Sequence, residues 1–177
     1  MSEIRWLDAR EQRAWRGLQE MQMRLGGEIG RRLAESSGLS AQDYAVLVIL
    51  TSDPEGSARF FELAARLGWE KSRLSHHIGR MERRGFVCKE KCEADRRGSF
   101  VRITPQGRSE IEAAAPGHLE DVRELFVDRL SREQLEILGD ITDAILEGLD
   151  RTDAASAGPG STGPGNTGSA EPSFSDP

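Results

Sequence analysis

The 177-residue sequence predicts a mainly α-helical fold, in which a winged helix-turn-helix core lies between N-terminal and C-terminal dimerisation helices. Three observations support this. Apolar residues recur at helical spacing near both chain ends, two short helical patterns adjoin in the middle, and a basic β-hairpin pattern follows them. We expect the winged helix at about residues 40–104 and the flanking helices at about 4–37 and 105–150.

The N-terminal part predicts a long helix, because apolar residues follow a spacing of three and four from Trp15 to Leu33. Gly38 is expected to end this helix. Ser40 then caps a second helix, and Asp43, three residues later, completes a capping-box pattern. The run Asp-Pro-Glu-Gly at 53–56 indicates a turn after that helix.

The middle of the chain combines two short helices with a hairpin. Gly68 and Gly85 each follow a helical pattern, and the polar, charged run 93–98 suits the tip of a hairpin. The expected elements are helices over 60–67 and 71–84 and strands over 86–91 and 100–103.

The last two helices begin with clear capping signals. Thr104 and Pro105 suit the N-cap and first helical position of a helix that Pro116 is expected to kink. Ser131 is expected to cap the final helix, whose apolar residues recur up to Leu149.

The final 27 residues, 151–177, differ in composition from the rest. Of these, 17 are Gly, Pro, Ser or Thr, so we expect a disordered tail. The sequence has no apolar run of membrane-spanning length and no secretory signal pattern, which favours a cytoplasmic protein. Two cysteines do not make a disulfide framework.

The net charge of −6 hides an uneven distribution. Residues 71–108 contain eleven basic and four acidic residues and carry +7, which leaves −13 on the remainder. A basic segment within an acidic chain is typical of a surface that binds a polyanion, although a solvated charged face has the same composition.

The helix expected at 71–84 has two distinct faces. Leu74, Ile78 and Met81 share the side that must point to the core, and His77 falls beside it as a partly buried, hydrogen-bonded histidine. The other side offers donors for base edges and phosphates in a major groove. The predicted DNA contacts on this helix are Lys71, Ser72, Arg73, Ser75, His76 and Arg80.

The tip of the hairpin carries two further predicted DNA contacts. Arg96 and Arg97 are long cations that suit the narrow, negative minor groove. Asp95, beside them, is expected to orient an arginine rather than to contact phosphate.

Several of these residues form a larger pattern, whose most specific part is the wing signature D-x-R, strand, T-x-x-G. The residues are Glu62-Leu63-Ala64, Leu67-Gly68, Leu74-Ser75, Ile78, Glu82-Arg83-Arg84-Gly85 and Asp95-x-Arg97-x-x-x-Val101-x-Ile103-Thr104-x-x-Gly107. Over about residues 10–150 the chain thus resembles the MarR family of bacterial transcriptional regulators. It departs from the common pattern at Trp69, where a smaller aliphatic residue is usual, and at the His76-His77 pair.

The resemblance implies an obligate homodimer that binds a pseudo-palindromic operator. It places the 71–84 helix in the major groove and Arg97 in the minor groove, and it implies a repressor that responds to a small-molecule effector. The implied effector pocket lies near Trp15, Tyr44 and His118. Independently of the resemblance, the apolar stripes at the chain ends need a partner surface. They include Trp6, Trp15, Leu125, Phe126, Leu138, Ile141 and Ile145.

Other functions are less consistent with the sequence. A winged helix that contacts protein predicts an apolar recognition face, whereas this one is basic. A thiol-responsive regulator would depend on Cys88 or Cys92, and a metal-responsive one on ligand-spaced residues, which do not appear. No catalytic motif is present, so we expect neither an enzyme nor a cofactor.

Overall fold

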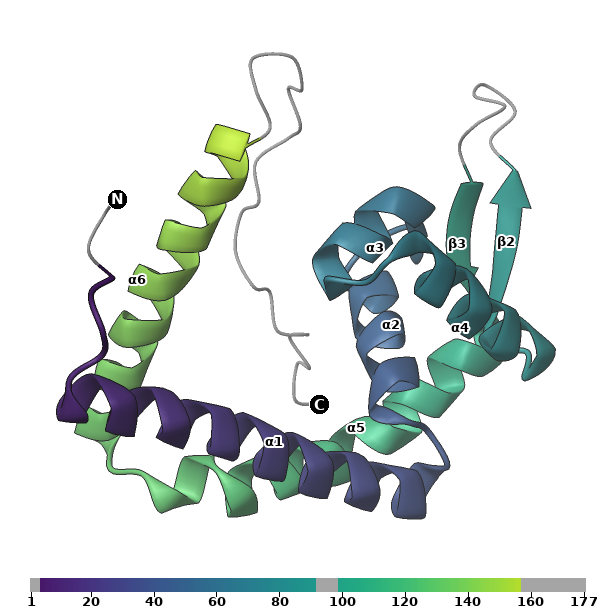
Figure 1. Ribbon diagram of the computed structural model, residues 1–177. Coiled ribbons are helices and arrows are strands. Elements are labelled where there is room, and N and C mark those ends of the chain that lie inside the picture. Colours follow the sequence, from purple (N-terminus) through teal and green to yellow (C-terminus); the bar gives the residue numbers. More distant parts are fainter. Residues whose placement is uncertain (1–3, 92–98, 157–177) are drawn as a thin grey trace. The chain divides into compact units, whose positions relative to one another are not determined.

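The computed structural model describes residues 4–91 and 99–156, which divide into two compact units, one ending at Asp121 and one beginning at Val122. Figure 1 shows a mainly helical chain with a small antiparallel sheet, which confirms the predicted fold class. In chain order, the elements are α1 (Ala9–Ser37), α2 (Ala41–Thr51), β1 (Ser57–Arg59), α3 (Phe60–Leu67), α4 (Lys71–Arg83), β2 (Val87–Lys91), β3 (Ser99–Ile103), α5 (Pro105–Leu125), the 3-10 helix η1 (Val127–Arg129) and α6 (Arg132–Ser156).

The boundaries of α1 and α2 follow from capping. Asp8 and Glu11 form a capping box at the start of α1, and Gly38 ends that helix in the left-handed conformation with φ +70°. At the start of α2, the Asp43 amide donates to Ser40 Oγ and the Ser40 amide donates to the Asp43 carboxylate, both at 3.1 Å. The predicted cap of α2 is therefore confirmed.

The sheet has three strands in the order β1-β3-β2, one more than the sequence predicted. The strand that was missed, β1, pairs antiparallel with β3, with Ser57 opposite Arg102. Three residues are too few to show the alternation that identifies a strand. Its position depends instead on the 53–56 turn, where the Gly56 carbonyl accepts from the Ile103 amide at 2.9 Å.

The core of the first unit joins α2, α3, α4 and the sheet. Leu74, Ile78 and Met81 are fully buried, as the helical pattern predicted, and they lie in one cluster with Leu47 and Val101. Each such aliphatic side chain contributes roughly 1.5–3 kcal/mol by leaving water. This burial fixes which side of α4 faces outward.

The T-x-x-G pattern joins the hairpin to α5. Thr104 Oγ donates to the Gly85 carbonyl at 2.6 Å and accepts from the Gly107 amide at 3.0 Å, so it is the predicted N-cap of α5. Gly107 is buried so close to Phe86 that a Cβ there would lie 2.1 Å from the Phe86 carbonyl oxygen. The glycine is therefore a packing requirement.

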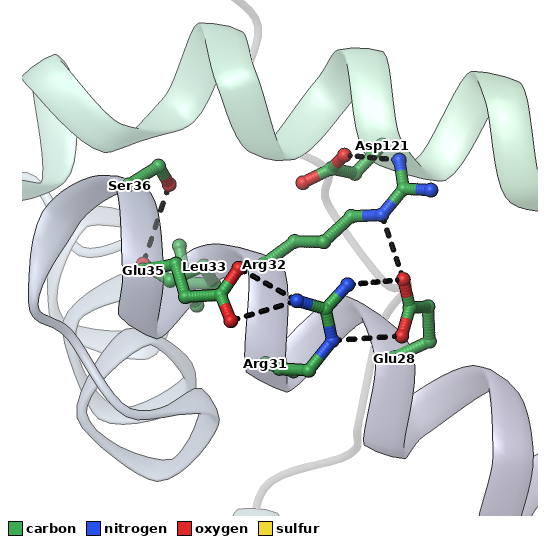
Figure 2. Close-up of polar contacts among 7 residues, drawn as sticks. All are labelled: Glu28, Arg31, Arg32, Leu33, Glu35, Ser36 and Asp121. Carbon is green, nitrogen blue, oxygen red and sulfur yellow. Dashed lines mark hydrogen bonds and ion pairs between the residues drawn. The ribbon is translucent and has the colours of Figure 1, made fainter.

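An ion-pair network links α1 to α5 within the first unit (Figure 2). Arg32 bridges Asp121 of α5 at 2.9 Å and Glu28 at 3.0 Å, and Arg31 forks between Glu28 and Glu35. Hydrogen bonds from Arg31 and Arg32 lower the pKa of Glu28 to about 2. The network is partly exposed and contributes little stability, and its Arg32–Asp121 pair connects α1 with α5.

The C-terminal helices extend further than the sequence predicted at one place, the end of α6. Helix α5 continues past Pro116, the position of the predicted kink, for nine further residues. Helix α6, capped by Ser131 as predicted, runs to Ser156, so residues 151–156 of the predicted tail are helical. The Thr152 hydroxyl there donates to the Gly148 carbonyl, one turn earlier in the helix, at 3.0 Å. Residues 157–177 lie outside the described residues. Among the residues that are described, no helix is both long and apolar enough to span a membrane.

Candidate nucleic-acid interface

The turn between α3 and α4 positions the outward face of α4. Gly68 adopts φ +61°, and the Trp69 amide donates to the Ala64 carbonyl at 2.9 Å. The Trp69 indole then contacts two residues of α4: the His77 ring edge-on at 5.1 Å and the Arg73 guanidinium at 4.5 Å, both measured between group centres. An aliphatic side chain has no aromatic face for the cation, so this departure from the common pattern orients Arg73.

All six residues predicted to contact DNA from α4 are exposed, whereas the stripe of Leu74, Ile78 and Met81 is buried. The six are Lys71, Ser72, Arg73, Ser75, His76 and Arg80. In the described part of the chain, the three cations among them form no ion pair with a carboxylate. Their positive charge is therefore available to an external anion.

Other cations of the basic segment are already paired. Lys89 lies 3.2 Å from a carboxylate oxygen of Glu82, and Arg102 lies 2.9 Å from one of Glu90. The first pair ties the hairpin to α4, which lies beside it (Figure 1), and the second links the two strands β2 and β3 of the hairpin itself. Internal pairing thus concentrates the net positive charge of the described segment on the outward face of α4.

The buried carboxylate of Asp43, predicted from the sequence only as part of a helix cap, contacts His77 of α4 and Arg84 just after it. Asp43 is 5% exposed and accepts from Arg84 Nη1 at 2.9 Å, and its Oδ1 lies 3.0 Å from His77 Nε2. Burial acts to raise the pKa of Asp43, but the close approach of the His77 ring and the hydrogen bonds with Ser40 outweigh it and lower the pKa from 3.8 to about 2. Asp43 therefore ties the start of α2 to the middle of α4 and to its C-cap.

We expect Asp43→Asn to lower the free energy of unfolding by about 2 kcal/mol at pH 7, as the size of the pKa shift implies. Because the folded-state pKa lies below the unfolded value, this stability is present above about pH 3.8 and is lost as the pH falls toward 2. Urea unfolding at several pH values should show wild type and variant converging in that window. Asp140→Asn, at an exposed position of α6, is the matched control, and an equal effect there would contradict the assignment.

A hollow of about 480 Å³ lies between the start of α2 and α4. Its lining is Ser40, Gln42, Asp43, Trp69, Arg73, His76, His77, Arg80 and Arg84. Arg73, His76 and Arg80 were predicted site residues, whereas Arg84, which lies 41 positions from its partner Asp43, was not. The spacing of residues along one helix cannot predict a contact between residues so far apart in the sequence.

The wing contacts predicted from sequence are Asp95, Arg96 and Arg97, and they lie outside the described residues. The described strands that flank them pair over five positions each, up to Lys91 opposite Ser99. The predicted strands of the hairpin are therefore confirmed.

Two of the three residues predicted to form an effector pocket lie together. The rings of Tyr44 and His118 have centroids 4.4 Å apart, and burial lowers the pKa of His118, against the nearby Asp121 carboxylate. Trp15 is half-exposed on α1. It is fifteen residues, or about 22 Å of helix, from Gly30, where α1 approaches the start of α2. Within one chain, Trp15 is therefore not beside the pair.

The possible metal ligands and the described cysteine do not form a further site among the described residues. Among the described residues, no three His, Cys, Asp or Glu side chains gather in a way that could hold a metal ion. Cys88 is a half-buried free thiol on β2, and Cys92 falls outside the described residues.

Comparison with known proteins found several close likenesses. A model of the MarR family matches residues 37–98. The transcriptional regulator HosA of Escherichia coli O127:H6 is 34% identical over 103 residues, which cover 58% of this chain and 74% of HosA. Among solved structures, AbsC of Streptomyces coelicolor, a MarR family transcriptional regulator, is 37% identical with a TM-score of 0.77, covering 83% of this chain and 99% of AbsC. Sco3205, a MarR family regulator from the same organism solved in complex with DNA, is 38% identical with a TM-score of 0.79, covering 84% and 93%.

Proposed function

Because this chain belongs to the MarR family of DNA-binding transcriptional regulators, we propose that it binds a pseudo-palindromic operator as a homodimer and acts as a repressor. The observation that carries the proposal is the outward face of α4, which presents Lys71, Arg73 and Arg80 without carboxylate partners among the described residues. A repressor of this kind acts by occupying DNA that the transcription machinery needs.

We assign distinct roles to the contact residues. Arginine donates two parallel hydrogen bonds to a guanine edge, so Arg73 and Arg80 are suited to base or phosphate contacts in the major groove. Lys71, a point charge at the start of α4, suits a phosphate. Arg96 and Arg97 of the wing are proposed to enter the minor groove, with Asp95 orienting one of them.

The proposed dimer is supported by apolar surface that one chain leaves exposed. Trp6 is 82% exposed ahead of α1, and Ile141, Ile145 and Leu149 are each about half exposed along α6. Such stripes are typical of an interface between two copies. A two-fold dimer would place two α4 helices about 34 Å apart, one turn of DNA. In this arrangement residues 40–104 read DNA, and 4–37 and 105–150 form the dimer.

Replacing Arg97 by alanine is expected to weaken operator binding by roughly tenfold or more, because each dimer loses two cations from the wing. The operator is first isolated by sequencing the DNA that the purified protein retains from a random pool. Affinities of wild type and variant are then compared by fluorescence anisotropy at matched salt.

The matched control is Arg24→Ala, which removes the same charge from an exposed ion pair on α1. Both variants should sediment as dimers and melt within a few degrees of wild type. If the binding curves of wild type and Arg97→Ala superimpose, the wing assignment is wrong, and a monomeric wild type would contradict the dimer.

A small-molecule effector is a second element of the proposal, and the contact between Tyr44 and His118 supports it. Nδ1 of His118 is buried, and no described residue accepts from it or donates to it, so a ligand could supply its missing partner. Such a ligand would act only through different affinities for two arrangements of the dimer. A screen for compounds that release wild-type protein from the operator, repeated with His118→Leu, tests this.

A further inference from the structure

Arg80, one of the exposed cations of α4, is held by a buried histidine. Its Nη2 lies 2.7 Å from Nδ1 of His77, one turn earlier on the helix. His77 is 5% exposed, and its other ring nitrogen, Nε2, lies 3.0 Å from Oδ1 of Asp43. We propose that His77 is a positioning residue that holds the Arg80 guanidinium in the orientation that reads DNA.

The chemistry of the three groups fixes the roles of the ring nitrogens. A guanidinium only donates hydrogen bonds, so Nδ1 of His77 must be the bare acceptor. The ring proton of the neutral imidazole then sits on Nε2, which faces the Asp43 carboxylate, an acceptor. The Nε2 contact has hydrogen-bond length, but its angle lies outside good hydrogen-bond geometry, so its attraction is mainly electrostatic.

The His77 imidazole is fixed by contacts with other residues, so it can orient the Arg80 guanidinium that it contacts. Asp43 approaches from α2, and the Trp69 ring packs edge-on at 5.1 Å. Arg84, the other charged group at this carboxylate, donates to Asp43 Oδ2 and leaves Oδ1 to His77. The contacts therefore run in sequence from the buried carboxylate through His77 to the exposed guanidinium.

Positioning matters because arginine is among the side chains that lose most rotamer freedom when they bind. A guanidinium already held in its bound orientation loses less of that freedom on contact with DNA, which strengthens binding without adding a contact. This inference rests on the proposed function, since it assigns Arg80 to the DNA-reading face. It adds a residue that would not itself touch DNA.

Two substitutions separate the two nitrogens of His77. In His77→Asn the amide oxygen can occupy the place of Nδ1 and keep the acceptor for Arg80, but the contact with Asp43 is lost. In His77→Gln the amide nitrogen can occupy the place of Nε2 and keep the contact with Asp43, but the acceptor for Arg80 is lost. We expect His77→Gln to weaken operator binding about tenfold per dimer and His77→Asn by less than about twofold.

Thermal stability should follow the opposite order, because only His77→Asn leaves the buried carboxylate short of a partner. In an Arg80→Ala background, the two variants should bind the operator equally. A purely structural role predicts that affinity falls with melting temperature in both variants, and that result would overturn the proposal, as would wild-type affinity in His77→Gln.

Two further measurements keep the test decisive. Nitrogen-15 NMR of histidine-labelled wild-type protein should show His77 as the Nε2–H tautomer, and a proton on Nδ1 would overturn the proposal even if the variants do not fold. Failure of the wild type to retain any DNA would instead contradict the proposed function, which separates the two outcomes.

Discussion

Replacing Gly107 by alanine is expected to lower the free energy of unfolding by about 3 kcal/mol, because nothing around this glycine can yield. The added Cβ would lie 2.1 Å from the carbonyl oxygen of Phe86 and 2.9 Å from its carbonyl carbon. That oxygen already accepts from the Thr104 amide at 3.0 Å, so it cannot move without breaking the junction between the hairpin and α5. Urea unfolding followed by circular dichroism measures the loss.

The matched control is Gly117→Ala in the same helix, where an added Cβ would meet no atom within 4 Å. Alanine has the higher helix propensity, so this variant is expected to be more stable by up to about 1 kcal/mol. Opposite signs at the two positions would confirm that Gly107 is required for packing. A similar change at both would show that the close approach to Phe86 costs nothing.

The affinity for operator DNA is expected to fall by about 10³- to 10⁵-fold between 50 and 200 mM salt. Six to ten phosphate contacts per dimer release that many counterions, which gives a slope of roughly −5 to −9 for log K against log salt. The positive charge behind this slope is the unpaired charge of α4 together with the wing. Anisotropy titrations at four or five salt concentrations give the slope directly.

Variants sharpen the salt experiment. Lys71→Ala removes one proposed phosphate contact from each protomer, so it should reduce the steepness by about two per dimer. Arg24 is paired with Glu20 on α1, so Arg24→Ala should leave the slope unchanged. A flat salt dependence of the wild type would favour a winged helix that contacts protein instead of DNA.

Local signals in the sequence predicted most of the fold, because each depends on residues within a few positions of one another. The capping box of Ser40 and Asp43, the helix end at Gly38 and the buried stripe of Leu74 and Ile78 were all predicted and confirmed. The exposed cations of α4 follow from the same periodicity, since burial of one face leaves the other outside. The boundary at Asp150 was misplaced by six residues, because composition averaged over a window does not locate a helix end.

Only the tertiary structure decided the contacts between segments that are distant in the chain. Strand β1 exists because β3 pairs with it, and Gly107 is required because Phe86 lies against it. The sequence determined that α4 presents a basic face. The fold then decided that the cations Lys71, Arg73 and Arg80 stay without a carboxylate partner among the described residues, whereas Arg84, just after α4, is bound to a buried carboxylate. The periodicity of apolar residues in a helix shows which of its side chains face the core and which face solvent. Whether an exposed cation finds a carboxylate partner depends on which distant residue the fold brings beside it.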